Sequence, residues 1–129
     1  MVQLGVLDQV YVSEGRTAHD ALWESTRLAQ AAESFGYTRF WVSEHHGMRA
    51  IAFSSPEVLI AHLAYARKKI RVGSGGIMLP HYSAYKVAEN FKLLEALHPG
   101  RIDLGLGRAP GGMPLSTRAL QEDKFVDIG

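Results

Sequence analysis

Two kinds of segment alternate along the chain. Short apolar runs of β type are each followed by a polar turn and then by a longer stretch in which apolar residues recur at helical spacing. The apolar runs cover residues 2–7, 40–42, 70–76 with a continuation to 79, and 101–107. This pattern predicts four strands separated by three helices.

The first predicted helix has start and stop signals at both ends. Thr17 and Asp20 have the spacing of a capping pair, and Gly36 is suited to end the helix. We expect one face to be buried, formed by Leu22, Ser25, Leu28, Ala29, Ala32 and Phe35.

The two later helices show the same kind of signals. Ser55, Pro56 and Glu57 are typical of a helix start. The basic residues 67–69 are expected to close that helix by interacting with its last carbonyl groups, and not to bind nucleic acid. The third helix is expected over residues 85–97, ended by Pro99 and Gly100.

Alternating strands and helices predict an α/β fold with a parallel sheet. Two architectures share this pattern: a doubly wound open sheet, which could be complete in 129 residues, and a (β/α)8 barrel, of which only the first half would be present. Both place their chemistry at the carboxyl ends of the strands.

The composition is that of an ordinary globular chain, 47% hydrophobic and 21% charged, and predicts a single domain. The absence of cysteine excludes disulfides, thiol nucleophiles and thiolate metal sites, and it fits a cytoplasmic protein. A formal charge of +1 does not indicate a nucleic-acid or membrane partner. Neither an export signal nor a membrane span is expected from the sequence.

The second strand ends at Glu44, His45 and His46, side chains that can hydrogen-bond, move protons or bind a metal. Neighbouring side chains on extended backbone point to opposite faces, so we expect no metal here. The alternative is that one histidine packs against the next helix while the other is solvated.

The third strand ends at residues 73–76, three of which are glycine. Glycine there favours either a flat ligand lying against the main chain or an unusual peptide conformation. The alternative is a β-bulge without a ligand.

The fourth strand leads into residues 105–111, which partly match a dinucleotide fingerprint. Pro110 occupies the place of the third glycine or alanine, and no further strand follows, so we do not favour that interpretation. Arg108 is a candidate phosphate clamp, approached closely because Gly107 leaves room. The alternative is an ordinary surface arginine.

Taken together, residues 40–46, 72–80 and 99–108 resemble the bacterial luciferase-like monooxygenases, which are flavin-dependent enzymes with a (β/α)8 barrel. The resemblance runs from about residue 3 to residue 111. It implies that residues 1–111 are an N-terminal half-barrel of about four strands that does not close, and that residues 112–129 are a mixed, partly helical tail of the same domain.

The resemblance also implies roles for the candidate residues. His45 would lie near the reactive face of the flavin, supported by Glu44 and His46. Gly75 and Gly76 would form a non-prolyl cis peptide beneath the ring.

The remaining implied contacts concern the cofactor. Arg108, with Gly107 beside it, would contact the FMN phosphate. Ser74 would belong to the cofactor-binding strand end, and Asp8 would line the pocket more loosely.

The implied activity is oxidation of a small organic substrate with O2 and reduced FMN supplied by a flavin reductase. Two alternatives stay open: an oxidoreductase of the same barrel class that uses the deazaflavin F420, and a non-catalytic half-barrel subunit or remnant. An open sheet edge invites association, so we expect a homo-oligomer or a complementing chain. A truncated or split gene product would explain the short length.

Overall fold

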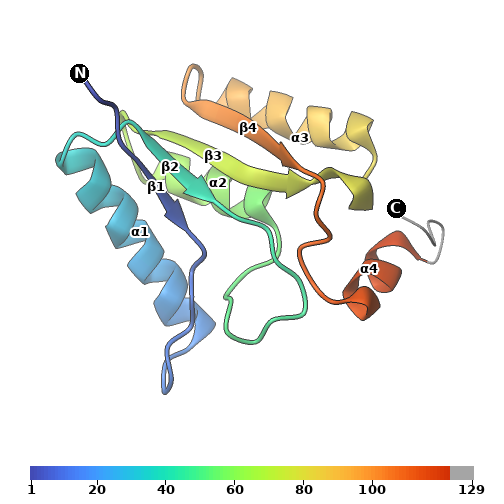
Figure 1. Cartoon of the computed structure of the whole chain (residues 1–129). Coiled ribbons are helices and arrows are strands. Elements are labelled where there is room, and N and C mark those ends of the chain that lie inside the picture. Colours follow the sequence, from blue (N-terminus) through green and yellow to red (C-terminus); the bar gives the residue numbers. More distant parts are fainter. Residues whose placement is uncertain (123–129) are drawn as a thin grey trace.

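A single parallel sheet forms the centre of the computed structural model, which describes residues 1–122. Its strands are β1 (Gly5–Asp8), β2 (Arg39–Val42), β3 (Arg71–Met78) and β4 (Ile102–Gly107). They lie side by side in the order β1-β2-β3-β4 (Figure 1). A doubly wound sheet reverses its strand order at a switch point, and these four strands do not. The structure therefore confirms the expected open α/β half-barrel.

The first helix, α1 (Ala18–Ser34), begins as predicted. The Thr17 hydroxyl accepts a hydrogen bond from the Asp20 N–H, and the Asp20 carboxylate accepts one from the Thr17 N–H. Its buried residues are small or polar: Ala21, Ser25, Thr26, Ala29 and Ala32. Leu28 and Phe35 are exposed, so the prediction for them was wrong. Small side chains bring the helix close to its neighbours, which leaves the larger ones at the edge of the contact.

The second and third helices are α2 (Pro56–Tyr65) and α3 (Ala84–Leu97). The core between helices and sheet is apolar, and its most deeply buried large side chains include Phe40, Val42, Ile60, Leu63 and Val72. The opposite face carries Leu7, Trp41 and the ion pairs of Arg39, Arg71 and Asp103. Leu104 and Leu106 are exposed on the helical face, because they lie on the edge strand β4. One face of the sheet is thus packed against helices, and the other is open and of mixed polarity.

The basic residues after α2 are organised by Glu33 of α1. The Glu33 carboxylate pairs with Arg67 at 3.0 Å and accepts main-chain N–H groups from Lys68, Lys69 and Ile70. Burial opposes ionisation of Glu33, but these donors outweigh it and lower the pKa of the carboxyl. Arg67 donates to the carbonyl of Ala66 at the helix end, as predicted, whereas Lys68 and Lys69 bind Glu33 through their main-chain N–H groups. The predicted helix cap is therefore only part of what this segment does.

Two short elements complete the fold at the carboxyl ends of the strands. A 3-10 turn, η1 (Leu79–His81), follows β3 and was not predicted. Helix α4 (Pro114–Gln121) lies in the segment from residue 112 that was expected to be partly helical, and residues 123–129 of that segment lie outside the described residues. No helix within residues 1–122 has both the length and the hydrophobicity needed to cross a membrane.

Candidate functional site

The parallel register brings the predicted site segments to one edge of the sheet. Val42 is paired with Ser74, and Met78 with Gly107, so the segments that follow β2, β3 and β4 lie next to one another. The regular pairing of β3 with β4 is interrupted between Ser74 and Ile77. The candidate chemistry of three motifs is therefore collected at the strand ends.

The interruption contains the Gly75–Gly76 peptide bond, which is cis, as the resemblance implied. Gly75 is exposed; a Cβ atom there would lie 3.3 Å from Trp41 Cβ and 3.5 Å from Leu7 Cδ1. A Cβ on Gly76 would meet the β4 main chain, with the carbonyl carbon of Leu106 at 2.9 Å. The glycines thus form a flat patch of main chain bordered by Trp41 and Leu7.

The Glu44 carboxylate is fully buried and has three hydrogen-bond donors. Oε1 accepts the Met78 N–H at 3.0 Å, while Oε2 accepts the Tyr82 hydroxyl at 2.6 Å and lies 2.5 Å from His46 Nε2. Burial is the main cause that raises the pKa of the Tyr82 phenol well above its usual range, and the interaction with Glu44 adds to it. The hydroxyl therefore keeps its proton. A buried carboxylate needs such donors.

The two histidines have different surroundings. His46 is buried against Glu44, whereas His45 is partly exposed and its Nδ1 lies 3.2 Å from Ser43 Oγ. His45 Nε2 is thus the nitrogen suited to exchange a proton with a ligand. Within residues 1–122, no cluster of three or more His, Asp or Glu side chains is arranged to hold a metal ion.

Arg108 is exposed and directly follows β4. Its loop is held against the end of β2, because the His46 N–H donates to the Gly111 carbonyl at 2.9 Å. A side chain on Gly107 would collide with Met78, 2.3 Å from its Cε. The structure thus places the guanidinium on a loop that is fastened to the histidine segment.

Two predicted residues use their side chains internally. Ser74 Oγ donates to the Gly105 carbonyl at 2.9 Å and accepts the Gly105 N–H, which joins β3 to β4. The Asp8 carboxylate accepts the Ser25 hydroxyl at 2.7 Å and the Val10 N–H at 2.9 Å. Ser74 thus stabilises the pairing of β3 with β4, and Asp8 fastens the end of β1 to α1 and to the loop at Val10.

Sequence reasoning missed His81 and Tyr82. His81 is buried, with Nε2 2.6 Å from the Pro110 carbonyl oxygen, and the Tyr82 hydroxyl reaches Glu44. A signal was available, because His81 and Tyr82 come three and four residues after the end of β3 and so fall at the same edge of the sheet as the other candidate residues.

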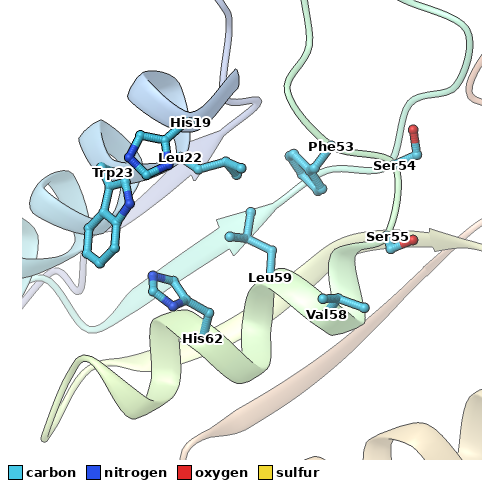
Figure 2. Close-up of a pocket in the computed structure, with 9 residues that line it drawn as sticks. All are labelled: His19, Leu22, Trp23, Phe53, Ser54, Ser55, Val58, Leu59 and His62. Atoms are coloured by element: carbon cyan, nitrogen blue, oxygen red, sulfur yellow. The ribbon is translucent and has the colours of Figure 1, made fainter. Parts of the chain in front are cut away.

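A separate cavity of about 410 Å³ lies between α1 and α2, on the helical side of the sheet (Figure 2). Trp23 and His62 meet edge to face there, 5.5 Å apart, and Leu59 lies beside them. His62 Nε2 is 2.9 Å from Thr26 Oγ1. This cavity includes none of the predicted site residues.

Comparison with known proteins gives the family. A sequence profile described as luciferase-like monooxygenase matches residues 2–119. The chain belongs to this family. It is 59% identical to the N-acetyl-S-alkylcysteine monooxygenase of Bacillus subtilis (strain 168), over 95% of this chain and 37% of that protein. The chain thus spans little more than a third of the length of this curated relative.

Solved structures agree with the family. The crystal structure of apo-MsnO8 is 48% identical with a TM-score of 0.93, over 97% of this chain and 38% of that one. The oxygenating constituent of 3,6-diketocamphane monooxygenase from Pseudomonas putida, a type II Baeyer-Villiger enzyme solved with FMN, is 26% identical with a TM-score of 0.81. The match covers 93% of this chain and 32% of that one.

Proposed function

We propose that this chain forms the amino-terminal half of an FMN-binding site and works as part of a monooxygenase that oxidises a small organic substrate with O2. The observation that carries the proposal is the exposed main chain at Gly75, bordered by Trp41 and Leu7 at the strand ends. The flat ring system of a flavin can lie against a surface of this kind, and a side chain at Gly75 would project into it. The residues present therefore fit a flavin.

The neighbouring residues would divide the remaining tasks. Arg108, on the loop that follows β4, would hold the phosphate through charge-assisted hydrogen bonds, and Gly107 would let Met78 pack beside the strand end. His45 would hold or move a proton through Nε2, while Glu44 and His46 keep its segment in place. Ser74 and Asp8 would support the ring surface through the main chain. Bound reduced flavin supplies the electrons with which O2 is activated.

A flavin reductase would supply the reduced cofactor. The Bacillus subtilis relative names one substrate class to assay first, the N-acetylated S-alkylcysteines. A further segment, a second copy or a complementing chain would complete the site. This is supported by the unpaired edge strands β1 and β4 and by the exposed side chains of Leu7, Leu104 and Leu106.

The test is titration of the chain with FMN, followed by flavin fluorescence. We expect saturable binding, and a Kd about tenfold higher for Arg108→Ala, the effect of losing one charged hydrogen-bonding partner. The matched control Arg27→Ala, on the exposed side of α1, should bind as the unaltered chain does. Absence of saturable binding, or equal affinity of both variants, overturns the proposal.

A second measurement concerns His45. His45→Ala should bind FMN within about threefold of the unaltered chain but lose about a hundredfold or more in turnover, the usual contribution of a proton-transfer group. Turnover would be measured with photoreduced FMN, O2 and an N-acetyl-S-alkylcysteine, with the complementing partner added if one is found. Preferential binding of F420 over FMN would replace the proposed cofactor with the deazaflavin.

A further inference from the structure

The turn after β3 lies between the two loops that carry His45 and Arg108. We propose that Tyr82 and His81 are positioning residues, which from this turn fix the end of β2 and the loop after β4 in the arrangement that the cofactor site requires. The proposal rests on the proposed function, because it assigns these residues to the same site. It adds to that function the means by which three separate strand ends are held in register.

Tyr82 acts on the end of β2 through Glu44. Its hydroxyl donates to Glu44 Oε2 at 2.6 Å, while the other carboxylate oxygen accepts the Met78 N–H at 3.0 Å. Glu44, which precedes His45, is thus held by Met78 before η1 and by Tyr82 after it. Loss of the phenolic hydroxyl would leave Oε2 with His46 alone, and a buried carboxylate that loses a donor shifts toward other partners or water.

His81 acts on the loop after β4. A carbonyl oxygen only accepts, so the 2.6 Å contact with the Pro110 carbonyl requires a proton on His81 Nε2. Nδ1 of a neutral ring is then an acceptor, and the Gln121 side-chain amide donates to it at 3.0 Å. Both ring nitrogens are therefore used, and the loop is held two residues after Arg108.

The segments after β2 and β3 bind two consecutive carbonyl groups of the loop after β4. His81 holds Pro110, and the main-chain N–H of His46 donates to Gly111 at 2.9 Å. The His46 and His81 rings are perpendicular, with centroids 5.8 Å apart. Gly111 packs closely here, since a Cβ atom would lie 3.0 Å from the Glu44 carbonyl oxygen. The segments of β2, β3 and β4 are thus joined at one cluster beside the strand ends.

The first test compares Tyr82→Phe, which removes only the hydroxyl, with the same change at Tyr85, a residue on α3 that is 75% exposed. Amide hydrogen exchange without flavin is measured at Met78, which donates to Glu44, and at Val72, which donates to Arg101 within the sheet. We expect Tyr82→Phe to accelerate exchange at Met78 at least tenfold more than at Val72 and to raise the Kd for FMN at least threefold. Tyr85→Phe should change neither.

The second test uses His81. His81→Ala should weaken FMN binding at least threefold, whereas His81→Gln, which keeps an N–H donor near Pro110, should restore most of the affinity. Both variants are checked by far-UV circular dichroism to confirm that they fold.

The outcomes separate this inference from the proposed function. Equal acceleration at Met78 and Val72, or unchanged exchange at both, would show that Tyr82 affects only general stability or nothing, and would overturn the inference. A normal Kd for FMN in Tyr82→Phe and His81→Ala would overturn it as well. If no form of the chain binds FMN, the proposed function fails, and the exchange measurement alone decides whether Tyr82 fixes the strand ends.

Discussion

Asp103 on β4 binds the guanidinium of Arg71 on β3 with both carboxylate oxygens, at 2.8 Å from Nη2 to Oδ1 and 2.9 Å from Nε to Oδ2. Arg39 on β2 adds a contact of 3.2 Å to the same carboxylate. Burial opposes ionisation of Asp103, but its hydrogen bonds and attraction to Arg71, together with Arg39, lower the pKa of the carboxyl. Three strands are therefore tied together by one charged group.

This arrangement predicts a pH-dependent stability. A carboxyl whose pKa is lower in the folded than in the unfolded chain stabilises the fold above its ordinary value of 3.8, and that stabilisation is lost as the pH falls through the folded-state value. Asp103→Asn should reduce the free energy of unfolding at pH 7 by about 1–2 kcal/mol, allowing for partial exposure. The variant should also lose less of its free energy of unfolding than the unaltered chain does when the pH falls below about 4. Urea denaturation at pH 7 and pH 3 measures both, and an unchanged difference between the two pH values would contradict the prediction.

Glu33, near the end of α1, is expected to contribute more to the free energy of unfolding than an ordinary surface carboxylate does. Glu33→Gln should lower the free energy of unfolding by about 2 kcal/mol, because three main-chain N–H groups and Arg67 lose a charged acceptor. The control is Glu24→Gln on the same helix, whose exposed pair with Arg16 should contribute less than about 0.5 kcal/mol. Equal effects in urea denaturation would count against the role of Glu33.

Two glycines at the strand ends should respond differently to alanine. Gly105→Ala would place Cβ 2.2 Å from the Ser74 carbonyl oxygen, so it should destabilise the fold by about 3 kcal/mol or prevent folding. Gly75→Ala projects into the open surface near Trp41 and should fold, while FMN affinity falls at least tenfold. Thermal denaturation and FMN titration of both variants check the pair. A well-folded Gly75→Ala with normal FMN affinity would show that the flat patch is not the ring surface.

Asp8 and Ser25 are predicted to be energetically coupled through their 2.7 Å hydrogen bond. Asp8 also holds Val10, a buried residue with a φ of 55°, which a β-branched side chain rarely adopts. Asp8→Ala should therefore cost about 1–3 kcal/mol and Ser25→Ala about 1 kcal/mol. In a double-mutant cycle the combined loss should fall short of the sum by about 1 kcal/mol. Strict additivity would contradict the coupling.

The sequence by itself determined the alternation of strands and helices and the places where the main elements begin. The Thr17–Asp20 pair and Pro56 act through neighbouring backbone, so their meaning is local and can be read from spacing. The strand ends were also predictable, because parallel strands bring their carboxyl ends to one edge. The motifs there pointed to the family and to the Gly75–Gly76 cis peptide.

Only the tertiary structure decided which side chains meet. Glu33 reaches residues 67–70, and Glu44 reaches Met78 and Tyr82, across more than thirty positions of the chain. Exposure of Phe35 and burial of His81 depend on the distance and angle at which helices and turns pack against the sheet. Periodicity gives the direction of a side chain relative to its own element, whereas hydrogen-bond partners depend on how separate elements are placed in three dimensions.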